Sequence, residues 1–245
     1  MLLLFGTAKA QFYLKNFEAR QRIYGTDTLK YRLMSPAKIE NNVRYPLVVF
    51  YHGAGERGAD NVRQLEIGVH RLAKDDYRAA YPCYVFAPQC PMKNRWVETD
   101  FKAPSHEVKP QPNKFFAYSL ERIDELVAEL PIDPGRIYVM GLSMGGFATW
   151  EALSRFPEKF AAAVPVCGGA DLNEVSKFCK VPIRVYHGEK DNIVTVERSR
   201  NAVAALQKCG AFPVYVEYPG VGHNCWSQCF NDPELYGWLF SQRKK

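Results

Sequence analysis

The residues Gly141-Leu-Ser143-Met-Gly145 form the pattern G-x-S-x-G, in which a serine hydroxyl can act as a nucleophile. A β-forming run at 137–140 leads into the pattern, and a helix-forming run at 147–153 follows it. A strand, a sharp turn and a helix in this order expose the serine Oγ at the top of a sheet. We expect glycine at 141 and 145 because a Cβ there would collide with chain that passes close to the serine.

A serine nucleophile needs a base to take its proton. The chain has five histidines, and four of them fall in earlier loops, in a helix or at the end of a strand. His223 instead follows the strand-like run 214–218 by a glycine turn, which places its imidazole at the rim of the sheet. We therefore predict that His223 is the base.

The base needs an acid that fixes its tautomer. Asp191 follows the strand-like run 181–186. Two other acids are rivals: Glu189 in the same loop, and Asp171 after the preceding strand. The chain order serine, acid, histidine is the order of the α/β-hydrolase fold, and it favours Asp191.

The acyl oxyanion that a serine nucleophile generates must be met by N–H groups. One candidate donor is the amide of Met144, which begins the helix after Ser143. The other is an amide in the glycine-rich loop 52–58, with Ala54 first and Gly55 as the alternative. A phosphate site is the competing interpretation of this loop, but the Lys-Ser/Thr of a P-loop and the G-x-G-x-x-G spacing are missing.

These residues need a sheet to hold them. The runs 22–24 and 29–33 alternate like a hairpin, whereas 45–51, 84–87, 160–166, 181–186 and 214–218 read as further strands, with 45–51 a continuous apolar run. We expect a loose helix at 61–78 and further helices at 115–130, 147–153, 196–206 and 233–242. Residues 88–113 are expected to form a long loop. Alternating strands and helices predict an α/β fold with a mostly parallel sheet of about eight strands, covered on both faces.

Residues from about 40 to 242 resemble an α/β-hydrolase of the serine esterase group. That group includes polyhydroxybutyrate-depolymerase-like, feruloyl and acetyl-xylan esterases and, more distantly, prolyl-oligopeptidase catalytic domains. Five motifs carry the resemblance: HGAGERG at 52–58, APQCP at 87–91 with Trp96, GLSMGG at 141–146, HGEKD at 187–191, and Gly222-His223 with Trp226. Cysteines at 90, 167, 225 and 229 lie unusually near the expected site.

The chemistry that follows is acyl transfer to water through an acyl-enzyme, with no metal and no organic cofactor required. Only residues 167–180 lie between two successive strands where a lid usually enters, so we expect an open cleft without a large lid. Trp96 and Trp226 are candidates to stack on a sugar ring or an aromatic acyl group, and Gln89 is a third candidate contact. These contacts suggest acetyl or feruloyl esters of plant polysaccharide as substrates.

Two other functions use the same fold. A serine peptidase of the prolyl-oligopeptidase type, acting on short peptides, would share every catalytic residue. A non-catalytic binding protein is the second alternative, although such relatives tend to lose a member of the triad. The oligomeric state cannot be read from the sequence.

The composition is that of a globular protein, with 47% hydrophobic and 24% charged residues in 245. The net charge is +6, but the basic residues are scattered, so we do not expect nucleic-acid binding. The longest apolar runs are too short for a membrane span. We expect one catalytic domain at 11–245.

Residues 1–10 resemble the end of a signal peptide, which would make the protein secreted or periplasmic; otherwise we expect it in the cytoplasm. The seven cysteines are not paired as zinc ligands, and the odd number leaves at least one outside an intrachain disulfide. Cys83 and Cys90 flank one expected strand, roughly 20 Å apart when extended, and should not bond to each other. Other pairings stay open.

Overall fold

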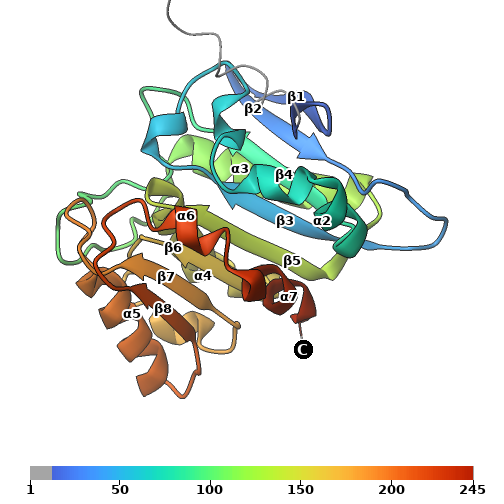
Figure 1. Ribbon diagram of the computed structural model, residues 1–245. Coiled ribbons are helices and arrows are strands. Elements are labelled where there is room, and N and C mark those ends of the chain that lie inside the picture. Colours follow the sequence, from blue (N-terminus) through green and yellow to red (C-terminus); the bar gives the residue numbers. More distant parts are fainter. Residues whose placement is uncertain (1–12, 245) are drawn as a thin grey trace, which may run out of the picture.

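A computed structural model describes residues 13–244, and it centres on an eight-stranded sheet in the order β1-β2-β4-β3-β5-β6-β7-β8 (Figure 1). β2 pairs antiparallel with both β1 and β4, and β3 to β8 run parallel to one another. The strands are β1 (Phe17–Tyr24), β2 (Asp27–Met34), β3 (Tyr45–Tyr51), β4 (Tyr84–Gln89), β5 (Ile132–Leu142), β6 (Ala162–Val166), β7 (Arg184–Gly188) and β8 (Val214–Tyr218). The predicted fold class is confirmed. The expected signal-peptide remnant at 1–10 lies outside the described residues.

Helices cover both faces of the sheet (Figure 1). They are α2 (Asp75–Ala80), α3 (Lys114–Glu129), α4 (Met144–Arg155), α5 (Glu197–Lys208), α6 (Trp226–Cys229) and α7 (Pro233–Ser241). Apolar side chains of α3, α4 and α5 pack in one core, and those of α6 and α7 pack in a second core on the opposite face. The fully buried strands β3 and β4 contribute alternate residues to both cores, which explains their continuous apolar runs.

All of the predicted strands form, but β1 and β5 begin earlier than their patterns predicted, at Phe17 and Ile132. In the hairpin, Tyr24 pairs with Asp27, so the turn holds two residues, and Gly25 adopts the positive φ of 59° that the turn requires. Leu29, Tyr31 and Leu33 of β2 are buried, while most of β1 is exposed. One face of this strand pair is therefore exposed to solvent, as the alternation predicted.

The loose helix expected at 61–78 is wrong. The segment forms two short 3-10 helices, Arg63–Leu65 and Val69–Ala73, before α2 begins at Asp75. Gly68 separates the first two with a φ of +79°, and a Cβ there would lie 2.4 Å from the ring of Phe230. The chain must turn at this glycine, and a continuous helix cannot form.

The remaining helices match their predicted positions to within a few residues. Pro88 and Gln89 belong to β4, and from Cys90 to Asn113 the chain has neither helix nor strand, as expected for most of 88–113. The loop still contributes to the core, because Trp96 and Val97 are buried.

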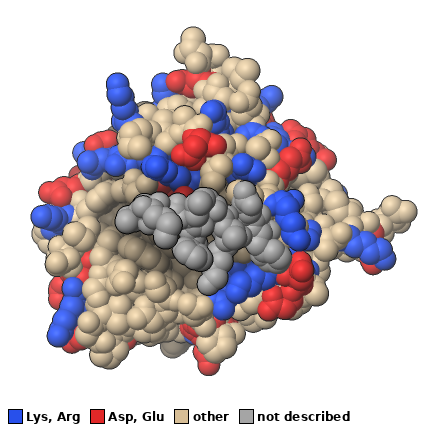
Figure 2. All heavy atoms as spheres, turned by 45° about the horizontal axis from the view of Figure 1, so that its top comes forward, with Lys and Arg blue, Asp and Glu red and all other residues tan. Residues whose placement is uncertain are grey.

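Basic and acidic side chains are interspersed on the face that Figure 2 shows. The scatter agrees with the absence of charge runs in the sequence. Among residues 13–244, no helix combines the length and apolar character needed to cross a bilayer.

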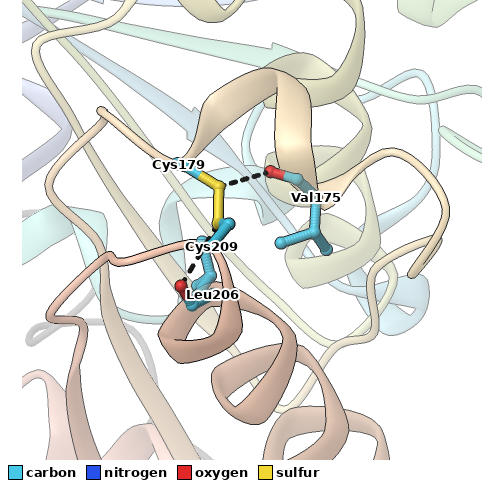
Figure 3. The surroundings of a disulfide bond; sticks show 4 residues. All are labelled: Val175, Cys179, Leu206 and Cys209. Carbon is cyan, nitrogen blue, oxygen red and sulfur yellow. Dashed lines mark hydrogen bonds between the residues drawn. A yellow bond between two sulfur atoms is a disulfide. The ribbon is translucent and has the colours of Figure 1, made fainter.

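A disulfide joins Cys179, which follows the short 3-10 helix Val175–Phe178, to Cys209 at the end of α5 (Figure 3). Both cysteines precede the amino-terminal ends of strands, β7 and β8 respectively. Cys83 and Cys90 are buried free thiols, so they do not bond to each other, as predicted. The sequence left the Cys179–Cys209 pairing open, because spacing alone does not bring these residues together.

Candidate active site

Ser143 occupies the sharp turn between β5 and α4, with a φ of +52° that a non-glycine residue rarely adopts. Its N–H donates to Val166 O over 2.9 Å, which ties the turn to β6. A Cβ at Gly145 would lie 1.9 Å from Tyr51 O, and one at Gly141 would lie 2.4 Å from Gly145 O. The turn therefore needs glycine at both positions, for the steric reason inferred from the sequence.

His223 lies between Ser143 and Asp191. Its Nδ1 is 2.6 Å from Asp191 Oδ2 and its Nε2 is 2.9 Å from Ser143 Oγ. A carboxylate only accepts hydrogen bonds, so Nδ1–H donates to Asp191, and in the neutral imidazole Nε2 is left to accept from the serine hydroxyl. This is the tautomer that a general base needs to take the proton of Ser143.

Asp191 is surrounded by donors. Burial by itself raises the pKa of Asp191, but hydrogen bonds from His187 and His223 and from the amides of Val194 and Ile193 outweigh it. The pKa of Asp191 therefore lies well below its usual range. The carboxylate stays ionised beside the imidazole and stabilises the positive charge that the base acquires.

His187 is the member of this group that the sequence reasoning missed. Its Nε2 lies 3.2 Å from Asp191 Oδ2 and 2.9 Å from Val194 O, and its Nδ1 lies 2.7 Å from Ser199 Oγ. The ring is fully buried and contacts the same carboxylate oxygen of Asp191 as His223 does. Its position at the end of β7, four residues before the acid, was the available signal.

The two rival acids serve other contacts. Glu189 accepts a hydrogen bond from the Gly220 N–H over 2.6 Å. Asp171 accepts from the amides of Val108 and Asn173, at 2.8 and 3.0 Å. Both carboxylates therefore support loops, and Asp191 is the acid whose oxygen meets the His223 ring.

The loop after β3 is held by His52. Burial lowers the pKa of His52 to about 4, so the ring is neutral at pH 7. Its Nε2 accepts from the Cys90 N–H over 2.9 Å, and its Nδ1 donates to Gly53 O over 2.6 Å. Trp96 Nε1 in turn donates to His52 O over 3.2 Å. The ring thus joins the end of β4 to the loop that carries Ala54 and Gly55.

A cleft of about 300 Å³ opens beside the triad. Its walls include two members of the predicted triad, Ser143 and His223, together with Trp226 and the loop residues Ala54 and Gly55. Met144, the other predicted donor, is buried at the first position of α4. A larger hollow of about 640 Å³ lies around Phe212 at the amino-terminal edge of the strands, and no triad residue lines it.

Two of the three predicted substrate contacts are wrong. Trp96 is fully buried and packs edge-on against Tyr51 and His52, so it cannot border the cleft. Gln89 is also buried; its amide accepts from the Asn61 N–H and donates to Glu56 O. Gln89 ends β4 and Trp96 lies in the loop after it. Both side chains hydrogen-bond to neighbouring loop backbone and so hold these loops in place. Trp226 does line the cleft, and its ring lies 5.2 Å from the ring of His223.

Cys167 approaches the triad from the end of β6. Its thiol and ligand atoms of Asp191 and His223 lie within 4.8 Å of one another, which is compatible with a metal site. The hydrogen bond between His223 and Asp191, however, already occupies the facing atoms of this pair. Burial raises the pKa of Cys167 well above its usual value, which keeps the thiol protonated and disfavours metal ligation. The arrangement serves proton transfer better than metal binding.

The chain is similar to several known proteins. A solved structure titled as a thermostable esterase is 38% identical, with a TM-score of 0.88, over 95% of this chain and 64% of the other. A probable carboxylesterase of Oryza sativa subsp. japonica, Os04g0669600, is 24% identical over 73% of this chain and 81% of its own length.

The bifunctional acetylxylan esterase/xylanase XynS20E of Neocallimastix patriciarum is 38% identical over 77 residues, 31% of this chain and 11% of its own length. The present chain therefore spans a small part of that relative and just under two thirds of the esterase structure. A family model described as Phospholipase/Carboxylesterase matches residues 37–234. The match spans most of the chain, and the expected resemblance to α/β-hydrolase esterases is confirmed: the protein belongs to the phospholipase/carboxylesterase family.

Proposed function

We propose that this protein is a serine carboxylic-ester hydrolase in which Ser143, His223 and Asp191 form the catalytic triad. The observation that carries the proposal is the unbroken hydrogen-bonded chain from Ser143 Oγ through His223 to Asp191 at the wall of a cleft. A binding protein has no use for a serine in a strained turn with its hydroxyl on an imidazole. The arrangement therefore favours catalysis over the binding-protein alternative.

The reaction starts when His223 Nε2 takes the proton of Ser143 Oγ, which attacks the ester carbonyl carbon. His223, now charged and held by Asp191, gives that proton to the departing alcohol as the C–O bond breaks. Water then attacks the acyl-enzyme, with His223 as base again. The acid leaves and the Ser143 hydroxyl is restored.

The oxyanion of each tetrahedral intermediate needs two N–H donors beside Ser143. We assign the Met144 amide, at the start of α4, and the amide of Ala54, with Gly55 as the alternative. The helix dipole of α4 supports the first, since the twelve-residue helix directs its positive end at the site. The contact of Ala54 and Gly55 with the cleft supports the second. Loss of one such donor typically costs roughly 3 kcal/mol of transition-state stabilisation.

We assign short acyl esters of plant polysaccharide, acetyl or feruloyl, as the substrate class. The cleft supports a small acyl group, and Trp226 offers a partly exposed ring beside the triad. One relative, XynS20E, carries acetylxylan esterase in its name.

A hydrolysis panel tests the proposal. The panel contains p-nitrophenyl acetate and butyrate, methyl ferulate, acetylated xylan and a peptide p-nitroanilide, each with wild-type protein and with Ser143→Ala. We expect ester hydrolysis that the substitution abolishes and little cleavage of the amide. Faster cleavage of the anilide than of any ester would replace the esterase by a peptidase.

A further inference from the structure

Glu56 is an acid at the catalytic cleft that the proposed mechanism does not use. It is the last residue of the short 3-10 helix Ala54–Glu56, directly after the loop amides assigned to the oxyanion. Its side chain lines the same cleft as Ser143 and His223, although the residue is only 9% exposed. An acid in this position faces whatever molecule enters the cleft.

One carboxyl oxygen of Glu56 has no partner. Oε2 is buried and makes no hydrogen bond to any residue among 13–244. The neighbouring cation turns elsewhere, because Arg57 donates to Ala54 O and Asn94 O. An unsatisfied buried acceptor costs roughly 1–3 kcal/mol, and a donor on a molecule that enters the cleft would remove that cost.

The position of this oxygen is fixed by the loop. A Cβ added at Gly53 would lie 2.9 Å from Glu56 Oε2 and 2.7 Å from Leu142 Cδ1. The carboxyl group therefore lies over Gly53, next to the residue that precedes Ser143. Glu56 and Ser143 line the same cleft, in which the scissile ester must bind.

Oε2 of Glu56 is an acceptor oxygen, and this indicates which part of a substrate it meets. Burial raises the pKa of Glu56, and nearby Glu66 adds to the effect. An acceptor cannot stabilise the reaction's oxyanion, which belongs on the amides. Glu56 Oε2 is instead suited to accept a hydrogen bond from a donor elsewhere on the substrate.

We propose that Glu56 selects substrates by accepting a hydrogen bond from a hydroxyl group next to the scissile ester. The inference rests on the proposed esterase function and narrows its substrates to esters of polyols or of hydroxy acids. A site built around such an acceptor discriminates strongly, because an analogue without the hydroxyl leaves the buried oxygen unpaired.

Methylated esters test the inference without a large change in shape. On the alcohol side, 2-hydroxyethyl acetate is compared with 2-methoxyethyl acetate; on the acyl side, methyl glycolate is compared with methyl methoxyacetate. We expect wild-type kcat/KM to favour the hydroxyl compound of one pair by roughly 10-fold or more. The pair that shows the preference identifies the side on which the hydroxyl lies.

Three variants complete the experiment. Glu56→Met removes the acceptor and should bring the preference close to one, whereas Glu56→Gln keeps an acceptor oxygen and should retain part of it. Glu158→Gln, a change to an exposed acid in the short 3-10 helix Pro157–Lys159 before β6, is the control and should leave both kcat/KM and the preference unchanged.

A wild-type enzyme without preference in either pair, or a preference that survives Glu56→Met, overturns the role of Glu56. p-Nitrophenyl acetate separates this failure from a failure of the esterase proposal. If p-nitrophenyl acetate is hydrolysed in a Ser143-dependent way but neither ester pair shows a hydroxyl preference, only the role of Glu56 is overturned. If no ester is hydrolysed, both the role of Glu56 and the esterase proposal are overturned.

Discussion

Asp191 receives hydrogen bonds from two imidazoles, His223 on the cleft side and His187 on the buried side. Two backbone amides, from Ile193 and Val194, complete its environment with 2.9 Å contacts to Oδ1. With so many donors the carboxylate has little freedom to rotate. A fixed carboxylate in turn fixes the ring of His223, and so the direction in which Nε2 meets Ser143.

Asp191→Asn should reduce kcat by about 10⁴-fold, because an amide in place of the carboxylate favours the wrong imidazole tautomer. Steady-state kinetics on p-nitrophenyl acetate give the value. Glu189→Gln and Asp171→Asn are the matched controls, since both acids contact only loop amides among the hydrogen bonds found for the described residues. A near-normal rate for Asp191→Asn with a large loss in either control would reassign the acid.

The sequence pointed to Ser143, Asp191 and His223 because the proposed chemistry needs a rare pattern. In this pattern a serine lies between two glycines, and an acid and a histidine follow later strands. The substrate contacts were not. Trp96 and Gln89 lie in motifs beside the site, but whether a side chain faces the cleft or the core depends on how the loop folds back. His187 was set aside for a similar reason, since strand residues give no sign of which loop they touch.

Among the elements, His52 joins three segments: the end of β3, the end of β4 and the loop with the amides that we propose for the oxyanion. Its motif predicted a loop of backbone donors, and the structure adds what keeps that loop in place. A neutral buried ring does this by accepting one hydrogen bond and donating another.

The contribution of His52 to stability should depend on pH. Burial lowers its pKa to about 4 from 6.5 in the unfolded chain, so the unfolded state binds the proton more readily. The contribution of the neutral ring to the free energy of unfolding is complete above about pH 6.5 and is lost as the pH falls through about 4. The total loss is up to roughly 3 kcal/mol. Thermal denaturation of wild type and His52→Asn at pH 7.5 and pH 4.5 should give a smaller difference in Tm at the lower pH. An equal difference at both values contradicts this role.

Elements with a strong period or a continuous apolar run were predicted well, as β3 and α3 show. The segment 61–78 was not, since its apolar residues gave a weak helical period. The turn at Gly68 depends on the close approach of the Phe230 ring to its backbone, and these two residues are far apart in the sequence.

At the scale of the molecule, the two edges of the sheet have different tasks. The carboxyl-terminal edge of β5, β7 and β8 carries Ser143, Asp191 and His223. At the amino-terminal edge, the Cys179–Cys209 disulfide joins the segments that lead into β7 and β8 (Figure 3). Loss of the disulfide should therefore lower the stability of the protein without altering the arrangement of Ser143, Asp191 and His223 at the opposite edge.

Reduction of this disulfide should destabilise the protein without loss of specific activity at 25 °C. The cysteines are 30 residues apart, and release of a loop of that size costs about 3.5 kcal/mol. The corresponding fall in Tm is about 10 °C for a domain of this length. Calorimetry with and without reductant measures it, and Cys179→Ala/Cys209→Ala should match the reduced wild type. An unchanged Tm, or a proportional loss of activity at 25 °C, would contradict the separation of the two edges.

The central claim is that Ser143 is an activated nucleophile, and labelling with a fluorophosphonate followed by peptide mass spectrometry tests it most directly. The account predicts one adduct per chain, on the peptide that contains Ser143, absent in Ser143→Ala and strongly slowed in His223→Ala. Folded wild-type protein that gains no adduct, or an adduct that persists in Ser143→Ala, would contradict it.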